Sequence, residues 1–563
     1  METRQIALFG ALAFLGFLLY QEWQKDYGSL AAPVQSSASA DSPFGDDSSA
    51  PVAASTVTGD LPTAASVTPT SVSAAAASPA GKQSYAKVET DTIAARVSNR
   101  GGTVTDLKLL KYPKVKKRPN DLVQLLNHQD AFYFVAQGGL VFGGYPQDQN
   151  PSHFADYELI SNDGGKLVYR WQNNGVTVDK ELTFVPGSYE TKINYQVQNN
   201  SDKPLTVQSY GQLVRSGATD VPPPPFVQTF LGGAVYEQKG EGFGFEKTKL
   251  SKFYKKDIAL KQEGGWVAMI QHHFAGAIIP PANKQVIIDS AVLAGPDGSK
   301  EKDYRADDRF RLRYVSANPE IVPVGGVLNI GDTLYVGPKL HNNLKEAAKG
   351  LPLAVDYGFF TIIAEPLFWV LKKLYQLTAN WGVAIILLTF LVKIFFYKPS
   401  EWQYRSMAKM RKFAPKIKAL KDRYGDDREK LNQAMMKLYK DEKFNPFGGC
   451  LPLLIQMPVF IALYWVLIES VELRQAPFFL WLNDLTSPDP LYILPLIFAV
   501  SMFAQQRLMA ASGTMDPMQE KVMMFMPIGM GIFFAFFPSG LVLYWVVNNL
   551  LSILQQWYIT RKV

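Results

Sequence analysis

Long apolar runs dominate the chain from residue 378 onward, with short polar segments between them. Five of these runs have the composition of transmembrane helices: 381–397, 451–468, 491–504, 522–537 and 541–554. Several contain only 14 to 16 residues, fewer than the roughly 17–25 that usually cross a bilayer. Two explanations stay open. Interfacial residues such as Trp557 and Tyr558 extend the runs, or the bilayer is thinned around the bundle.

A sixth apolar run, "IALFGALAFLGFLLY", occupies residues 6–20 and is followed by Trp23, a residue type that is common at membrane interfaces. The alternative is a cleaved signal peptide, because the small residues "SLAA" at 29–32 resemble a cleavage site. That stretch lies too far beyond the apolar run, so we predict a retained N-terminal anchor over residues 1–27.

Lysine and arginine are concentrated in one short segment. Residues 399–449 carry thirteen of them against seven acidic residues, whereas the loop 473–490 has only Arg474. Because cytoplasmic loops carry an excess of positive charge, this segment and both termini are predicted to be cytoplasmic, which agrees with an even number of six spans. The long segment 82–345 is then external. Its lysines do not oppose this, because long translocated domains escape the rule.

The external segment has the pattern of a β protein. It follows residues 28–81, whose Ala-, Ser- and Pro-rich composition predicts a flexible linker. In "KINYQVQ" the apolar residues Ile193, Tyr195 and Val197 share one face of a strand, and "LVYRW" and "VTVDKELTFV" are similarly strand-like. Turn residues separate these stretches. The pattern predicts an all-β sandwich rather than alternating βαβ units.

The sequence contains little sign of catalytic chemistry. None of the five histidines has the spacing of a metal motif, and the adjacent His272 and His273 are expected on opposite faces of a strand. HExxH, GxSxG and Walker motifs are absent from the sequence. The single cysteine, Cys450, excludes an intrachain disulfide. We therefore predict no enzyme and no bound cofactor or metal, although a sandwich groove could still bind sugar or peptide.

Two further segments have amphipathic helical patterns. Residues 401–424, the break "GDD" and a second amphipathic stretch predict a helical hairpin within the cytoplasmic segment 399–449. Its basic faces suit anionic lipid or ribosomal RNA, or they simply hold the segment inside the cell. Residues 355–377 mix apolar and charged side chains and predict a helix that lies on the outer membrane face.

One charged side chain interrupts the apolar run "LLTFLVKIFFYKP". A lysine at mid-bilayer costs about 2.5–3.5 kcal/mol on insertion scales. Lys393 lies five residues before Lys398, about 7.5 Å at the helical rise, so its amine could reach the interface by snorkelling. Taken alone, Lys393 fits this explanation at least as well as a functional one.

Other polar residues favour a functional role for Lys393. Thr389 lies one helical turn away on the same face. Polar side chains recur at helical spacing in the last span and near one end of the third: Tyr544, Asn548, Ser552, Gln555 and Gln456. Because the apolar runs contain no matching acid, this pattern indicates a wet cavity rather than a buried ion pair. Ordinary hydrogen bonding between helices is the alternative for Asn548 and Gln456.

Methionine and phenylalanine are concentrated near the C-terminal spans. Eight of the fifteen methionines fall between residues 502 and 530, and "FFAFF" follows at 533–537. These side chains make soft surfaces that adapt to varied apolar partners. As a cluster they favour a promiscuous contact surface, whereas core packing explains each residue taken singly.

Five stretches together carry a specific resemblance: "KFNPFGGC" (443–450), "LLIQMPVFIALYWVL" (453–467), "SVELRQAPF" (470–478), "DPMQEKVMMFMP" (516–527) and "FPSGLVLYW" (537–545). With them the chain resembles the YidC-type membrane protein insertases of Gram-negative bacteria, relatives of the mitochondrial and chloroplast insertases. The resemblance implies a periplasmic β-super-sandwich after the first span, in agreement with the pattern of 82–345. It also implies a five-span insertase core.

The expected protein is a multidomain membrane protein: a six-span α-helical bundle with a periplasmic all-β super-sandwich and a cytoplasmic helical hairpin. The expected parts are the N-terminal anchor 1–27, the linker 28–81, the super-sandwich 82–345, the interfacial helix 355–377, the second span 378–398, the hairpin 399–449, and the remaining spans 450–472, 490–508, 520–537 and 539–558.

The resemblance also implies a site. Members of the family enclose a hydrophilic groove that is open to the cytoplasm and lipid and closed to the outside, with a positive residue in the second span. That residue is commonly arginine, and lysine lacks its bidentate fork. The groove residues implied here are Lys393, Thr389, Gln456, Tyr544 and Asn548. The residues implied for a substrate slide, along which client helices pass, are Met457, Pro458, Phe460, Met526 and Phe533.

The function that the resemblance implies is that of an inner-membrane insertase and folding chaperone. Its expected partners are nascent inner-membrane proteins, membrane lipids and the Sec translocon. It would act alone or together with the translocon. A ribosome would be contacted through the cytoplasmic loops, because the tail carries no long basic extension before Val563. Two other classes stay open: an ion-coupled transporter, which requires an acidic partner and internal repeats, and a membrane-tethered glycan-binding enzyme centred on 82–345.

Overall fold

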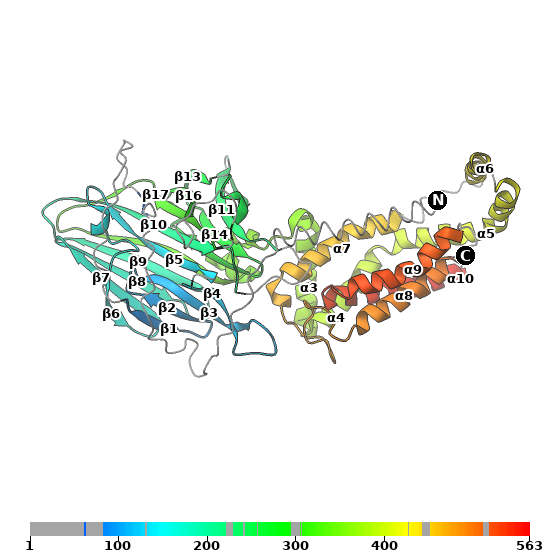
Figure 1. Ribbon diagram of the computed structural model, residues 1–563, viewed down its shortest axis with the longest axis horizontal. Helices are drawn as coiled ribbons and strands as arrows, with labels where there is room; N and C mark the ends of the chain where they lie inside the picture. Colours follow the sequence, from blue (N-terminus) through cyan, green and yellow to red (C-terminus); the bar gives the residue numbers. More distant parts are fainter. Residues whose placement is uncertain are drawn as a thin grey trace. The chain divides into compact units, whose positions relative to one another are not determined.

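The structure is a computed structural model that describes residues 61–62, 83–129, 132–220, 229–239, 242–255, 257–293, 305, 307–425, 427–441, 451–510 and 517–562. The predicted anchor 1–27, the rest of the predicted linker 28–81 and Cys450 lie outside these residues. The chain forms two compact units, which divide between Val355 and Asp356 (Figure 1). We call them the β unit and the helical unit.

The β unit contains two antiparallel sheets (Figure 1). Within the described residues, the first sheet has ten strands in the order β1-β2-β3-β5-β10-β17-β16-β13, with β4 paired to β3 and β18 paired to β10. Its strands are β1 (Tyr85–Glu89), β2 (Ile93–Ser98), β3 (Thr103–Pro113), β4 (Leu122–Leu126), β5 (Phe134–Phe142), β10 (Leu205–Ser216), β13 (Ala259–Glu263), β16 (Gln285–Leu293), β17 (Arg309–Ser316) and β18 (Glu320–Val322).

The second sheet has nine strands among the described residues, in the order β12-β11-β14-β15-β19-β9-β8-β7-β6. Its strands are β6 (Glu158–Asn162), β7 (Lys166–Asn173), β8 (Val176–Phe184), β9 (Glu190–Asn199), β11 (Gly232–Lys239), β12 (Gly242–Lys249), β14 (Trp266–Gln271), β15 (Phe274–Ile279) and β19 (Val327–Pro338). A short helix, α2 (His341–Ala347), follows the last strand.

The two sheets pack face to face, as the predicted sandwich requires. Buried and less buried side chains alternate along all nine residues of β8, which is the pattern of a strand with one face in a core. In β9, Tyr195 and Val197 are 1% and 0% exposed, in agreement with the predicted inward face. Across the core, the ring of Phe134 in β5 lies so close to Gly276 in β15 that a Cβ there would come within 2.9 Å of it.

A buried lysine bridges the space between the sheets. Nζ of Lys180 in β8 donates to the carbonyl oxygens of Gly101 at 2.7 Å and of Gly138 in β5 at 3.3 Å. Burial lowers the pKa of Lys180 to about 7, an effect that the negative charge of Asp332 partly opposes. Burial also raises the pKa of Asp332 in β19 to about 6. The sandwich core therefore holds two groups that titrate near neutral pH.

Two local features differ from the sequence pattern. His272 and His273 form the turn between β14 and β15, and their rings stack with centroids 3.7 Å apart. The prediction that they point to opposite faces of a strand was wrong, because the chain reverses at these two residues. Within the predicted linker, Leu61 packs against Val141 and Tyr210 of the first sheet, so the linker contacts the sandwich at this point.

The described part of the helical unit contains eight α-helices (Figure 1). They are α3 (Thr361–Thr378), α4 (Trp381–Phe395), α5 (Tyr397–Tyr424), α6 (Arg428–Asp441), α7 (Leu451–Glu469), α8 (Ile493–Ala510), α9 (Pro517–Phe534) and α10 (Ser539–Lys562). Asn380 begins α4 as its N-cap, because its side-chain oxygen accepts from the backbone N–H of Val383 at 3.1 Å.

The helices are longer than several of the apolar runs that predicted them. The runs of 14 to 16 residues belong to α8, α9 and α10, which have 18, 18 and 24 residues. By length and hydropathy, no single described helix qualifies as a membrane span. The pair formed by α4 and Tyr397–Arg405 of α5 does qualify, with a bend of 63° between the two helices.

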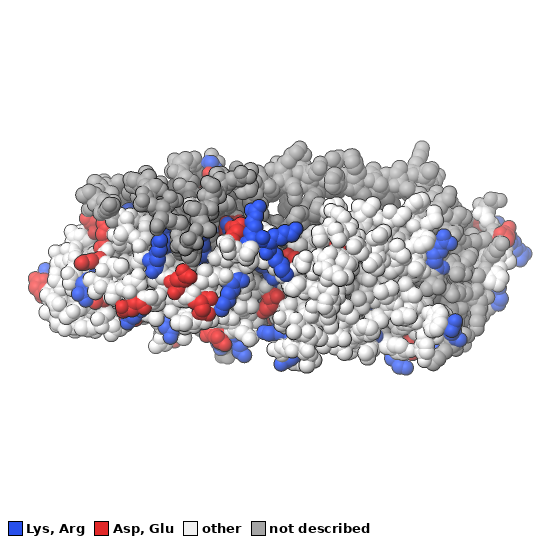
Figure 2. All heavy atoms as spheres, turned by 90° about the horizontal axis from the view of Figure 1, so that it is seen from below, with Lys and Arg blue, Asp and Glu red and all other residues white. Residues whose placement is uncertain are grey.

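The surface of the helical unit is largely apolar. On the face shown in Figure 2, charged side chains of both signs are scattered over the β unit, whereas much of the helical unit carries none. Large exposed apolar side chains recur along α8 and α9: Leu496, Ile497, Val500, Phe503, Met524, Phe525, Met526, Ile528, Ile532 and Phe533. Such a surface is typical of helices that contact lipid or apolar partners.

Candidate functional site

The amine of Lys393 points toward α10 rather than toward the membrane boundary. Its Nζ donates to Oγ of Ser552 at 2.8 Å. By contrast, the side chain of Lys398 is 88% exposed and pairs with Glu401. Among the described residues, no salt bridge involves Lys393, although its side chain is half-buried. This geometry favours the cavity interpretation of Lys393 over snorkelling.

A chain of hydrogen bonds extends from Lys393 across three helices. Oγ of Ser552 donates to the backbone oxygen of Asn548 at 2.7 Å, one turn earlier in α10. Nε2 of Gln456 in α7 donates to Oδ1 of Asn548, also at 2.7 Å. Lys393 and Gln456 are half-buried, whereas Asn548 and Ser552 are 5% and 4% exposed. We call these four residues the polar chain.

The other two predicted groove residues lie beside this chain without extending it. Thr389 is fully buried, and its hydroxyl donates to the backbone oxygen of Ile385 at 2.7 Å, so it is satisfied within α4. Tyr544 is 1% exposed and lies one turn before Asn548 in α10. Its hydroxyl lies beside the side chain of Gln456, although within the described residues it makes no hydrogen bond of standard geometry. Of the five predicted groove residues, hydrogen bonds thus connect Lys393, Gln456 and Asn548.

Several buried polar atoms in the described part of the bundle lack a hydrogen-bond partner: Tyr544 Oη, Trp545 Nε1, Gln555 Nε2, Gln556 Oε1, and both side-chain polar atoms of Gln506. An unpaired buried polar group costs about 1–3 kcal/mol, and lipid provides no hydrogen bonds to replace it. Bound water, or the polar groups of a bound molecule, would satisfy these atoms. The arrangement therefore fits a hydrated interior.

The predicted slide residues divide into exposed and packed side chains. Met457 of α7 is 38% exposed, and Met526 and Phe533 of α9 are 42% and 53% exposed. Phe460 instead packs edge-on against Trp545 of α10, with ring centroids 5.0 Å apart. Pro458 lies inside α7, where it removes one backbone N–H donor. Met457, Met526 and Phe533 are therefore available to an apolar partner.

The sequence pattern contained polar residues that the predicted site left out. Ser552 belongs to the spaced set in α10, yet its role as the acceptor for Lys393 requires the relative rotation of α4 and α10. A second contact lies between α10 and α8, where Nδ2 of Asn549 donates to Oγ of Ser501 at 3.4 Å. In the sequence, the seven-residue spacing of Asn549 and Gln556 places both on one face of α10, and this spacing could have predicted a second polar contact.

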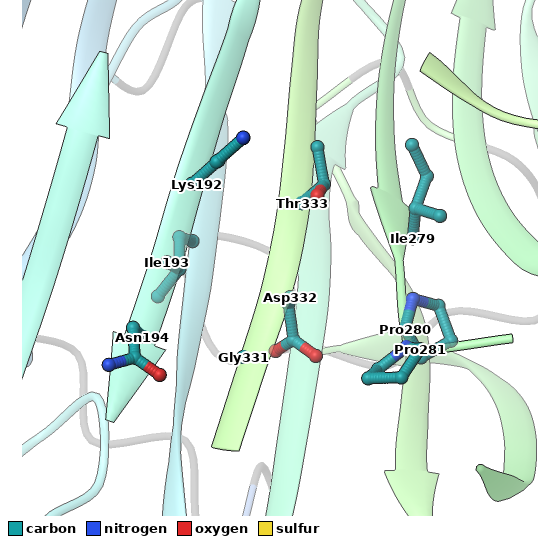
Figure 3. A pocket seen from close by; sticks show the side chains of 9 residues that line it. All are labelled: Lys192, Ile193, Asn194, Ile279, Pro280, Pro281, Gly331, Asp332 and Thr333. Carbon is teal, nitrogen blue, oxygen red and sulfur yellow. The ribbon is translucent and has the colours of Figure 1, made fainter. Parts of the chain in front are cut away.

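The β unit has a surface hollow of about 320 Å³ between β9, β15 and β19 (Figure 3). It is lined by Lys192, Ile193, Asn194, Ile279, Pro280, Pro281, Gly331, Asp332 and Thr333. Figure 3 shows the amine of Lys192 and the amide of Asn194 pointing away from each other. These two polar groups therefore do not converge on one point in the hollow.

Comparison with known proteins matches each of the two units to a protein family. The family described as YidC periplasmic domain matches residues 85–370, and the family described as 60Kd inner membrane protein matches residues 373–563. The membrane protein insertase YidC of Nitrosococcus oceani is 41% identical over 579 residues, which covers 100% of this chain and 99% of that protein. This chain belongs to the YidC family of membrane protein insertases.

A second relative agrees with this assignment. The YidC insertase of Methylococcus capsulatus is 41% identical over 573 residues, covering 100% of this chain and 99% of that protein. A crystal structure of an active YidC insertase, with its first transmembrane domain resolved, covers 84% of this chain and 92% of its own at 18% identity and a TM-score of 0.38. The predicted family and function are confirmed: the chain is an inner-membrane protein that acts as an insertase on nascent membrane proteins.

Proposed function

We propose that this YidC-family insertase moves the polar ends of its clients along the polar chain while their apolar helices pass over the exposed side chains of α7 and α9. The observation that carries the proposal is the 2.8 Å hydrogen bond between Lys393 and Ser552. This bond points the amine of Lys393 into the bundle, and among the described residues the amine has no carboxyl partner. Tyr544 and Thr389 lie beside the chain and complete the groove. Met457, Phe460, Pro458, Met526 and Phe533 form the slide.

The energy for insertion comes from the client. Each Leu, Ile, Phe or Val residue gains roughly 0.3–0.6 kcal/mol at mid-membrane, so about twenty apolar residues make insertion downhill. The barrier is the passage of the client's polar end through hydrocarbon. A hydrated groove shortens that passage, and a cation at Lys393 attracts acidic ends. No nucleotide hydrolysis or other catalysis is required, and we propose that the protein is not an enzyme.

The proposed topology places six spans in the inner membrane, with both termini and a hairpin of α5 and α6 in the cytoplasm. The predicted anchor 1–27 supplies the first span, the β unit is periplasmic, and α3 lies on the outer membrane face. Ile362 and Leu377 of α3, and Phe359 just before it, support this position, because each is more than 80% exposed. The basic α5 and α6 are the proposed contact for a ribosome, and the insertase acts alone or with the Sec translocon.

Charge substitutions at Lys393 test the proposal. In cells depleted of the native protein, Lys393→Glu should impair insertion of a client with an acidic polar end more than Lys393→Ala does, and Lys393→Arg should be tolerated. At about 4 Å, one charge pair is worth about 1 kcal/mol in water and about 4 kcal/mol at an effective dielectric of 20. The initial insertion rate should therefore fall by about fivefold or more, since a tenfold change corresponds to 1.4 kcal/mol.

Two controls make this test specific. Lys398→Glu makes the same charge change five residues away on a side chain that is 88% exposed, and it should leave insertion unchanged. A client whose acidic residues are replaced by neutral ones should be insensitive to Lys393→Glu. If Lys393→Glu inserts the acidic client at the normal rate, Lys393 does not act through its charge and the proposed groove mechanism is wrong.

A further inference from the structure

The loop between α7 and α8 is tied to the beginning of α10. We call residues 470–492 the clasp loop. The backbone N–H and the hydroxyl of Ser539 donate to the carbonyl oxygens of Ser487 at 2.8 Å and Asp484 at 2.9 Å. The backbone N–H of Gly540 donates to the carbonyl oxygen of Leu485 at 2.9 Å. These three bonds satisfy N–H and O–H donors at the first turn of α10, which otherwise lack partners within the helix.

The same loop also holds the beginning of α4. Nδ2 of Asn380 donates to the backbone oxygen of Phe478 at 3.3 Å. The ring of Phe478 packs directly on Gly382, where an added Cβ would lie only 2.0 Å from its Cδ2. Because only glycine leaves room for this ring, the first turn of α4 and the clasp loop fit each other closely. The clasp loop thus joins the ends of α4, α7, α8 and α10.

Asp489 organises the clasp loop from a buried position, with an exposed fraction of 1%. Its Oδ1 accepts from Nε1 of Trp481 at 2.9 Å and from the backbone N–H of Leu491 at 3.0 Å. Its Oδ2 accepts from the backbone N–H of Leu494, in the first turn of α8, at 2.7 Å. One carboxyl group therefore connects the middle of the loop to the start of α8.

The backbone of the clasp loop is strained. Gln475, Leu480 and Tyr492 have φ angles of 57°, 57° and 56°, in the left-handed region that residues with a side chain rarely adopt. Such conformations persist only where surrounding contacts enforce them. The hydrogen bonds of Asp489 and those to α10 are among the contacts that hold the loop in this shape, so weakening these bonds should let the loop relax into a different shape.

The opposite end of the bundle is held differently. There the polar chain joins α4, α7 and α10 through side chains that water can replace as partners, whereas the clasp loop uses backbone bonds and a buried carboxyl. We infer that the clasp loop is the seal that closes the outer end of the groove, and that Asp489 is the positioning residue that keeps it closed during insertion. This inference rests on the proposed groove and names what closes it.

Access of a water-soluble reagent from the periplasmic side tests the inference. In the full chain with Cys450→Ser, a single Thr389→Cys substitution provides a buried reporter inside the bundle. Spheroplasts are treated with a membrane-impermeant maleimide, and labelling of the reporter is followed over time. With the clasp loop intact, labelling should be slow. Asp489→Ala should accelerate labelling by about tenfold or more, because it removes three hydrogen bonds from a buried acceptor.

Asp484→Ala is the matched control, because it removes a carboxyl from the same loop. Among the described residues, the side chain of Asp484 bonds only to Thr486 and Ser487, two and three residues further along the chain. Labelling should stay slow in this variant. If labelling rises in neither variant, or rises equally in both, the inference is wrong. If Asp489→Ala does not accumulate in the membrane, Asp489→Asn is used with the same criteria.

The result is independent of the groove mechanism. Lys393→Glu can leave insertion unchanged while Asp489→Ala still accelerates labelling of the cysteine reporter. This result would indicate a sealed bundle without a charge-dependent groove. Conversely, insertion can depend on Lys393 while the reporter stays closed in Asp489→Ala. In that case the groove stands, and the clasp loop is not its seal.

Discussion

Replacing Lys393 by methionine should stabilise the helical unit while it impairs insertion. Methionine keeps much of the length of the lysine side chain and removes its charge. A lysine at the centre of a span costs about 2.5–3.5 kcal/mol, and water in the groove lowers this cost for Lys393. The bond to Ser552 returns about 0.6–1.7 kcal/mol if it resembles other hydrogen bonds between membrane helices. No carboxyl group among the described residues pairs with Lys393, so the free energy of unfolding should increase by up to about 3 kcal/mol.

Thermal unfolding of the purified full chain in detergent, followed by its helical circular dichroism, measures this effect. For a unit of this size, each 1 kcal/mol should raise the midpoint by roughly 2–4 °C. Lys398→Met is the control, and because that side chain is 88% exposed its effect should stay within about 0.5 kcal/mol. A lower midpoint for Lys393→Met alone would refute the reasoning, since it would show that the amine mainly holds α4 against α10.

Two further predictions concern stability. Between pH 7 and pH 10.5 the stability of the β unit should rise by up to about 1.4 kcal/mol per pH unit, because Lys180 has a pKa of about 7 when folded and 10.5 when unfolded. Between pH 3.8 and about 6 the raised pKa of Asp332 should lower stability as pH rises, so urea unfolding should show the lowest stability near pH 6–7. Lys180→Met should abolish the rise in stability above pH 7. A rise that persists in this variant contradicts the assignment. Gly382→Ala should destabilise the helical unit by about 1–3 kcal/mol, because the added Cβ would overlap the ring of Phe478. An unchanged midpoint of thermal unfolding would show that the clasp loop moves to make room for this Cβ.

The elements that the sequence predicted best are those with a simple period. The alternation in 176–185 located β8 because one face of that strand lies in the core along its whole length. The spacing of Tyr544, Asn548 and Ser552 located a polar face of α10 for the same reason. Short-range chemistry also placed helix ends, since the break after 424 coincides with the end of α5 at Tyr424.

The features that the sequence did not predict depend on how separate elements meet. Which of several polar residues accepts from Lys393 is decided by the relative rotation of α4 and α10, and no periodicity within one helix contains that information. The side chain of Asp489 bonds to Trp481, eight residues earlier, across a loop that contains unusual φ angles. Hydrophobic patterning says little about such a loop. The pair His272 and His273 was misplaced because two residues suffice for a turn.

The hydration of the groove is the central claim, and thiol accessibility from the cytoplasmic side tests it most directly. In chains with Cys450→Ser, single cysteines replace Gln456 in the polar chain, Lys398 at the exposed end of the span, and Leu391, which is 45% exposed on an apolar part of α4. A charged, water-soluble thiol reagent is added to inverted membrane vesicles. A hydrated groove predicts that Gln456→Cys reacts nearly as fast as Lys398→Cys, whereas Leu391→Cys stays unreactive in lipid. A Gln456→Cys variant as unreactive as Leu391→Cys would contradict the account.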